Sequence, residues 1–257
     1  MVNAAFAVEE EVGYITIQRE EALNAIDTPT KLEIIDRLEA YRVDDDVRAV
    51  VFQSEGDQAF TAGGDLDEVI DVDFDLSYHT ETWDELFTSM MRLGKPTIAK
   101  VDGWALGGGF DLLLHTDIVI AADDAMIGQP EIGLGILNHF SPAMLPSLVG
   151  LRTTMELLLT GDPITGERAA NVGLVTRAVP ADELDDEIED VLDSIRSNPA
   201  RITKHVKDAI WASIDMSPSA ARAHIEARSL DSARTEPYYE EGVRAQREDR
   251  EPDWDLQ

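Results

Sequence analysis

The chain has 257 residues, of which 44% are hydrophobic and 28% are charged. This composition supplies enough apolar side chains for a sizeable core, which excludes a chain that is disordered throughout. The chain has no cysteine, so disulfides, thiolate metal sites and thiol nucleophiles are excluded. The formal net charge is −31, which disfavours nucleic acid and anionic lipid as partners because both bind to cationic patches.

The basic residues are mostly arginine, since only five of the 21 are lysine. A dense carboxylate surface with little lysine is typical of adaptation to high salt, where screening reduces self-repulsion, and it indicates a halophile. Residues 1–14 lack the basic and apolar regions of a signal peptide, and no apolar run is long enough to span a bilayer. We therefore expect a cytoplasmic protein with no membrane partner.

The hydrophobic pattern predicts alternating strands and helices in the first part of the chain. The expected elements are, in order, a strand at 12–18, a helix at 30–42, a strand at 47–55, a helix at 81–94, a strand at 97–101, a helix at 109–115, and strands at 118–122 and 173–179. From residue 181 onward the pattern is helical only. This order predicts an α/β layered core with a helical C-terminal portion.

Two glycine-rich segments follow predicted strands. In FTAGGDLDE (60–68), two glycines precede Asp65, which can cap a following helix. In KPTIAKVDGWALGGGFD (95–111), a strand leads into three consecutive glycines and then a helix. Three glycines lose more conformational entropy on folding than larger residues would. Their presence would be explained if exposed backbone amides at the start of the helix bind an anion. Taken alone, each segment is also compatible with a tightly packed turn.

A third segment, IGQPEIGLG (127–135), places a carboxylate after a fixed backbone. Pro130 restricts the chain just before Glu131. Taken alone, a Pro-Glu pair is more typical of a solvated turn. The three segments gain weight only in combination.

Together, FTAGGDL, ALGGGFD and GQPEIGLG resemble the enoyl-CoA hydratase/isomerase (crotonase) family. The segments at 21–27, 157–180 and 241–254 extend the resemblance over roughly residues 10–254. The resemblance implies a crotonase-like spiral of ββα turns in residues 1–195 and a helical oligomerisation region in residues 196–257. It also implies a trimer or a dimer of trimers, an acyl-CoA thioester as substrate, and neither a metal nor a cofactor beyond the coenzyme A of that substrate.

Carried over residue by residue, the resemblance places the two amides of an oxyanion hole at Gly64 and Gly108. One such donor contributes about 3 kcal/mol to stabilising an enolate-like transition state. Glu131 would activate water and protonate Cα, and Asp111, 20 positions earlier, would be the second acid/base. The remaining substrate and coenzyme A contacts fall on Ala25, Ala62, Gly63, Asp65, Leu66 and Gly107.

The chain departs from the hydratase pattern near these carboxylates. Asp111 stands where the hydratases have glutamate, so the backbone has to compensate for a missing methylene or the reaction differs. NHFSPA (138–143) replaces a glycine-rich stretch. Within it, His139 is a candidate third titrating group or a partly exposed loop residue, and Phe140 is expected to narrow the acyl pocket.

Other residues bear on coenzyme A and on the core. Gln246 and Asp249 stand where the family has Phe and Lys near the coenzyme A of a neighbouring subunit, which weakens the case for that contact. Trp83, Phe87, Met90 and Met91 lie in the helix that is expected to cover the acyl pocket, and a hydrophobic stripe of this kind is more typical of core than of a binding surface.

The first functional prediction is an enoyl-CoA hydratase, a hydro-lyase that adds water across the double bond of a 2-enoyl-CoA. One alternative is an enoyl-CoA or dienoyl-CoA isomerase, although the dienoyl branch has an acid where this chain has His139. Another alternative is a non-catalytic acyl-CoA-binding protein of the same fold, which Asp111, His139 and Phe140 favour. The fold alone cannot choose among these functions.

Overall fold

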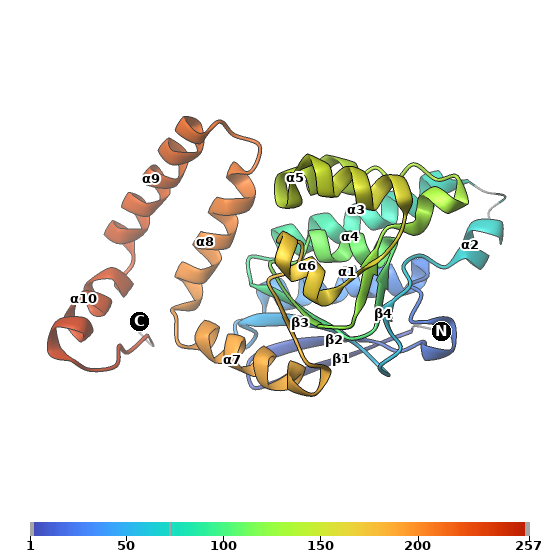
Figure 1. Cartoon of the computed structure of the whole chain (residues 1–257). Coiled ribbons are helices and arrows are strands. Elements are labelled where there is room, and N and C mark those ends of the chain that lie inside the picture. The colour runs from blue at the N-terminus through green and yellow to red at the C-terminus, as the bar shows by residue number, and fades with distance from the viewer. Residues whose placement is uncertain (1–2, 72, 74, 255–257) are drawn as a thin grey trace.

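Two β-sheets form the body of the protein in the computed structural model, which describes residues 3–71, 73 and 75–254 (Figure 1). The larger sheet has the order β1 (Ala4–Glu9), β2 (Val12–Ile17), β3 (Ala49–Ser54), β5 (Thr97–Val101), β7 (Ile118–Ala122) and β10 (Arg177–Val179). The smaller sheet has the order β4 (Ala59–Thr61), β6 (Trp104–Leu106), β8 (Met126–Gly128) and β9 (Ile164–Thr165). Neighbouring strands are parallel except in the pairs β1–β2 and β8–β9.

Successive turns of the chain repeat one unit of two strands and a helix. Each turn adds a strand to the larger sheet, a strand to the smaller sheet, and then a helix: α3 (Leu76–Arg92) after β3 and β4, α4 (Gly108–Leu114) after β5 and β6, and α5 (Ser141–Thr160) after β7 and β8. The predicted ββα spiral is confirmed. Because β4, β6 and β8 are parallel neighbours, the segments that follow them meet at one edge of the smaller sheet.

The core lies on both faces of the larger sheet. Residues 49–52 of β3 are all buried, as expected for a parallel strand that is covered on both sides. Helix α1 (Thr28–Val43) packs beside α3. It begins two residues earlier than predicted, because the Asp27 side chain accepts a hydrogen bond from the amide of Thr30 and Pro29 fits the first turn.

Some elements differ from the sequence prediction. The strand expected at 173–179 is reduced to β10, because Gly173, with φ of 81°, ends helix α6 (Gly166–Val172) and the chain turns before pairing. Helix α5 was not predicted. Its pattern is interrupted by Pro146 and by Gly150, which has φ of 76° and is not helical.

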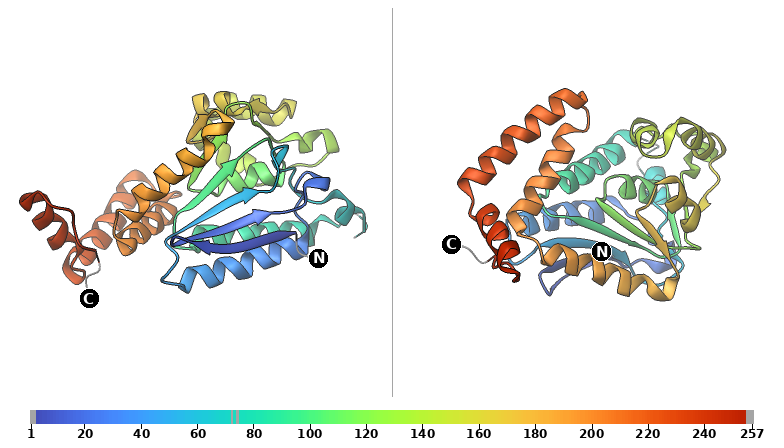
Figure 2. Two further views of the ribbon diagram at one scale, coloured as in Figure 1. Left: turned by 90° about the horizontal axis from the view of Figure 1, so that it is seen from below. Right: turned by 60° about the vertical axis from the view of Figure 1, so that its left-hand side comes forward.

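Helix α7 (Leu184–Arg196) packs against β5 and β7 of the larger sheet. The last three helices, α8 (Ala200–Ser213), α9 (Pro218–Thr235) and α10 (Tyr238–Glu248), form an arm that stands away from the two sheets (Figures 1 and 2). Asp117, just before β7, anchors α8 by accepting hydrogen bonds from Lys207 Nζ at 2.7 Å and Trp211 Nε1 at 2.9 Å. Among the helices described, none has the length and apolar character needed to cross a membrane.

Candidate active site

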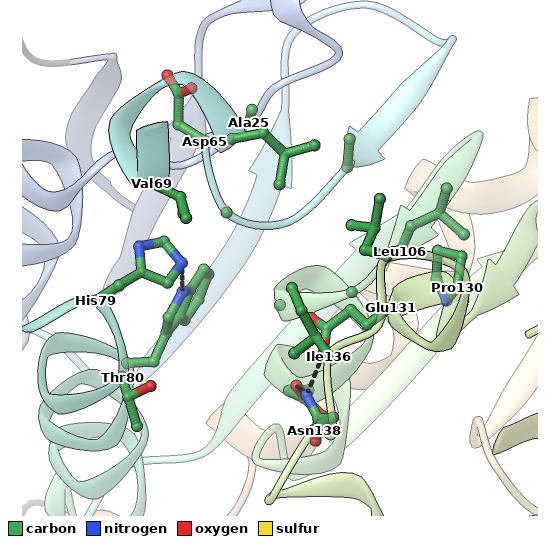
Figure 3. A pocket seen from close by; sticks show the side chains of 18 of the residues that line it. Ala25, Asp65, Val69, His79, Thr80, Leu106, Pro130, Glu131, Ile136 and Asn138 are labelled. Atoms are coloured by element: carbon green, nitrogen blue, oxygen red, sulfur yellow. Dashed lines mark hydrogen bonds between the residues drawn. The ribbon is translucent and has the colours of Figure 1, made fainter. Parts of the chain in front are cut away.

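The segments that follow β4, β6 and β8 enclose a cavity of about 420 Å³ (Figure 3). The cavity is lined by most of the residues selected from the sequence: Ala25, Ala62, Gly64, Asp65, Leu66, Gly107, Gly108, Asp111 and Glu131. Gly63 lies close behind them, since a Cβ added there would be 2.7 Å from the amide nitrogen of Gly108. The structure therefore gathers the three chemistry-bearing segments in one place.

Asp65 has a structural role in this arrangement. Its carboxylate forms an ion pair with Arg19 and accepts a hydrogen bond from the amide of Asp67, which caps the start of the short helix α2 (Leu66–Asp71). The helix-capping role expected for Asp65 is confirmed. These contacts fix the loop that carries Gly63 and Gly64.

The amides of Gly64 and Gly108 are available to an external acceptor. Gly108 is the first residue of α4, and Gly107 before it has φ of 55° and ψ of −122°, a conformation that favours glycine. Within the described part of the chain, no hydrogen-bond acceptor contacts either amide. Two such donors at one cavity can stabilise a negatively charged oxygen.

Side chains packed against these glycines explain why no larger residue fits. A Cβ added at Gly108 would lie 2.5 Å from Cζ2 of Trp83, and one added at Gly64 would lie 2.5 Å from Nε2 of His79. Trp83 donates a hydrogen bond to His79 through Nε1 and Nε2, at 3.2 Å. A single hydrogen-bonded pair on α3 therefore supports both amide positions.

Buried charged groups hold this His–Trp pair in place. His79 Nδ1 lies 3.3 Å from Nζ of Lys31 and 3.6 Å from Oε2 of Glu68. Burial lowers the pKa of Lys31 to about 8, against the opposing charge of Glu68. Burial, followed by the charge of Lys31, also lowers the pKa of His79. An uncharged His79 is consistent with its acceptance of the indole N–H.

The helix that carries Trp83 borders the cavity, as expected from the sequence, whereas the role of His79 was missed. Trp83 is only 5% exposed, as expected for core, yet it also lines the cavity. His79 and Trp83 are four residues apart on one helix, which could have indicated a contact between them. That spacing is also compatible with ordinary packing, so the functional position was not visible in the sequence.

Asp111 is enclosed by hydrogen-bond donors. Its carboxylate is 2% exposed and accepts from Nε2 of Gln129, at 3.2 Å to each oxygen, from Nδ2 of Asn138 at 2.6 Å, and from the hydroxyl of Ser141. Burial raises the pKa of Asp111 to about 7, although the bonds from Ser141 and Asn138 act in the opposite direction. Asp111 can therefore hold a proton near neutral pH.

Glu131 has one carboxylate oxygen held and the other directed at the glycine turn. It lies in the short helix η2 (Pro130–Leu134), where Pro130 fixes the entry. Oε2 accepts from Asn138 at 3.0 Å, whereas Oε1 is 3.3 Å from where a Cβ would stand on Gly107. Burial raises the pKa of Glu131, and the Asn138 bond and the charge of His139 lower it. This carboxylate is a stronger base than a solvated one.

The segment that departs from the hydratase pattern lines the cavity opposite α3. Figure 3 places His79 and Thr80 on one side, and Glu131, Ile136 and Asn138 on the other. The ring of Phe140 meets Phe87 edge-on at 4.9 Å between centroids, and Phe87 stacks on Trp83 at 5.3 Å. Trp83 and Phe140 line the cavity, and Phe87 packs between their rings.

The remaining candidates have different positions. His139 also lines the cavity, and its ring centroid is 3.8 Å from that of Phe140. Gln246 lies near the end of α10 and Asp249 caps that helix, and neither contributes to the cavity lining. No cluster of three His, Cys, Asp or Glu side chains suited to a metal ion occurs among the described residues.

The spiral of ββα turns, with paired glycine amides beside carboxylates, defines a protein of the crotonase class. A family model for enoyl-CoA hydratase/isomerase matches residues 7–257, and the chain belongs to this family. It is 34% identical to a probable enoyl-CoA hydratase of Mycobacterium bovis over 248 residues, 95% of this chain and 94% of that one. It is 35% identical to a crotonyl-CoA hydratase of Syntrophomonas wolfei over 197 residues, 76% of each chain.

Solved structures agree with this assignment. An enoyl-CoA hydratase from Mycobacterium smegmatis superposes with a TM-score of 0.93 at 28% identity and covers 100% of both chains. The family and the fold predicted from the sequence are confirmed. The curated relatives are hydratases, in agreement with the predicted hydro-lyase.

Proposed function

We propose that this protein is an enoyl-CoA hydratase that adds water to a 2-enoyl-CoA thioester. The observation that supports this proposal is the convergence of two free amides, at Gly64 and Gly108, with the carboxylate of Glu131 on one cavity. The thioester carbonyl would accept both N–H groups, so that negative charge can develop on its oxygen. No cofactor is required beyond the coenzyme A that the substrate carries.

Glu131 performs the proton transfers in this proposal. Its Oε1 takes one proton from a water molecule as the water oxygen bonds to Cβ of the substrate. The electrons of the double bond move toward the thioester, which becomes an enolate held by Gly64 and Gly108. The enolate collapses as Glu131 returns the proton to Cα, which leaves a 3-hydroxyacyl-CoA. Asp111, predicted as the second acid/base, supports Glu131 from within the buried hydrogen-bonded cluster.

Crotonyl-CoA in molar salt provides the direct test. We expect loss of absorbance of the conjugated enoyl thioester and a product heavier by one water molecule. No turnover of crotonyl-CoA or of longer 2-enoyl-CoA substrates would refute the hydratase. In that event, turnover of 3-enoyl- or dienoyl-CoA would identify an isomerase, and thermal stabilisation by these ligands without turnover would identify a binding protein.

We also propose that the acyl chain is short. Trp83 and Phe140 line the cavity that the oxyanion amides also line, and Phe87 packs against both rings, an arrangement that favours a short chain. A relative from Clostridium acetobutylicum, 33% identical over 210 residues, is named a short-chain-enoyl-CoA hydratase. We therefore expect a preference for crotonyl-CoA.

Replacing Phe140 by alanine should relax this preference. We expect the ratio of kcat/KM for 2-decenoyl-CoA to that for crotonyl-CoA to rise by about tenfold or more, since each buried methylene contributes on the order of 1 kcal/mol. Phe6→Ala is the matched control, because Phe6 packs on Arg37 away from the cavity. If this ratio of kcat/KM values were unchanged in Phe140→Ala, or if the wild type preferred the long chain, Phe140 would not limit the length of the acyl chain.

We propose further that residues 196–257 form the oligomerisation region of a cytoplasmic trimer or dimer of trimers that is adapted to high salt. Apolar side chains remain exposed on the arm, namely Val206, Ile210, Ile214, Leu230 and Val243. Sedimentation velocity in molar KCl should give a trimer or hexamer that dissociates at low salt, because its subunits each carry a net charge of −31. A monomer at every salt concentration would exclude this assembly.

A further inference from the structure

Asn138 contacts both carboxylates of the site, although nothing in the family resemblance assigns it a role. Its Nδ2 donates to Oδ2 of Asp111 at 2.6 Å and to Oε2 of Glu131 at 3.0 Å (Figure 3 shows the Glu131 contact). It begins the stretch NHFSPA that replaces the glycine-rich stretch of the hydratases. One nitrogen therefore joins the two acidic side chains of the cavity.

The orientation of this amide is fixed by the backbone. Oδ1 of Asn138 accepts hydrogen bonds from the amides of Phe140 and Ser141, both at 2.9 Å. A backbone N–H can only donate, so the side-chain oxygen has to face these two groups. The NH₂ group must then point at the carboxylates, and both of its hydrogens are used. The start of α5 thus sets the donor direction at the active site.

This fixed donor treats the two oxygens of Glu131 differently. Oε2 is occupied by Asn138, whereas Oε1 faces the glycine turn at Gly107, where the cavity lies. Asp111 accepts from Asn138 on one oxygen and from Ser141 on the other, with Gln129 shared between them.

We propose that Asn138 is a positioning residue for hydration, one that holds Oε2 of Glu131 so that Oε1 alone takes the proton from water. The inference rests on the proposed function of this site. It makes Asp111 a second positioning group, which acts through Asn138. An N–H donor also stabilises the ionised form of Glu131, which is the form that can act as a base.

Asn138→Asp separates this role from a purely structural one. Aspartate keeps an oxygen for the amides of Phe140 and Ser141, so the start of α5 remains capped. Its second oxygen, however, replaces a donor with negative charge beside Asp111 and Glu131. We expect kcat/KM for crotonyl-CoA at neutral pH to fall on the order of 100-fold, as for other misplaced catalytic groups.

The pH profile is the readout that a structural role would not change. Glu131 must be ionised to accept the proton, and its pKa rises when a donor is exchanged for a like charge. The acid limb of log kcat/KM against pH should therefore move to higher pH by about one unit or more, with activity partly recovered as the pH increases. Asn138→Ala, which removes the donor without adding charge, should move the limb less and in the same direction.

Asn24→Asp is the matched control. Asn24 also accepts from a backbone amide, that of Arg19, and donates to two backbone carbonyls, those of Glu55 and Ala59, but among the residues that the structure describes it contacts no carboxylate. We expect lower thermal stability with an unshifted acid limb. An unshifted limb in Asn138→Asp, or wild-type activity in that variant, would overturn the proposal.

An inactive wild type would refute the proposed function but would still allow this inference to be tested. The titration of Glu131 can then be followed by ¹³C NMR of the labelled side-chain carboxyl groups, with Glu131→Gln used to assign the signal. A higher midpoint for Glu131 in Asn138→Asp than in the wild type would support the inference. The same midpoint in both proteins would overturn it.

Discussion

Glu131→Gln is expected to lower kcat for crotonyl-CoA by about 1,000-fold, within the range for loss of a general acid/base. Glutamine has the size of glutamate and can still accept the hydrogen bond from Asn138, so the cavity keeps its shape. It cannot take a proton from water or return one to Cα. KM should change little, because the amides of Gly64 and Gly108 still bind the thioester. The decay of the enoyl-thioester absorbance in molar salt measures both constants.

Glu167→Gln is the control for the change in charge. Glu167 lies exposed in the first turn of α6, outside the cavity, and its replacement should leave kcat unchanged. If Glu131→Gln kept more than a tenth of the wild-type rate, another group would have to supply the proton. The assignment of Glu131 as the base would then be wrong.

Gly108→Ala should reduce kcat by about 100-fold or more, in line with loss of one oxyanion-hole donor. The added methyl group would stand 2.5 Å from Trp83, so either the indole or the start of α4 has to move. Movement of α4 displaces the amide that faces the carbonyl oxygen. Overpacking of this kind also costs about 1–3 kcal/mol of stability, which a thermal melt would detect.

Gly133→Ala is the comparison on a neighbouring element. Gly133 lies in η2 two residues from Glu131, and a Cβ there would meet no atom within 4 Å. This variant should melt and turn over like the wild type. Retention of full activity and stability in Gly108→Ala would show that Trp83 yields freely and does not support the amide.

The sequence identified the segments of the site but not the reason that they meet. Gly64, Gly108 and Glu131 were selected because the three segments that carry them together resemble the enoyl-CoA hydratase/isomerase family. They converge because β4, β6 and β8 are parallel neighbours. Each of these strands has only three residues, which is too short for any alternation of polar and apolar positions to be recognised.

The residues that position the candidate catalytic groups were harder to predict from the sequence than those groups themselves. His79 lines the cavity and accepts a hydrogen bond from Trp83, and helical spacing alone does not distinguish that arrangement from packing. The donor role of Asn138 depends on two backbone amides that hold its oxygen, which is a property of the folded chain. Helix α5 escaped prediction because Pro146 and Gly150 interrupt its pattern.

Each successive turn of the spiral contributes different residues to the site. The turn through β4 carries Gly64, the turn through β6 carries Gly108, and the turn through β8 carries Glu131 and Asn138. In the proposed mechanism, the first two turns supply the amides that stabilise the enolate, and the third supplies Glu131, which moves the protons. Substitutions confined to residues 129–141 can therefore change how protons reach and leave this intermediate, while the two amides that stabilise it stay intact. One fold can support different reactions in this way while it keeps the same pair of oxyanion-binding amides.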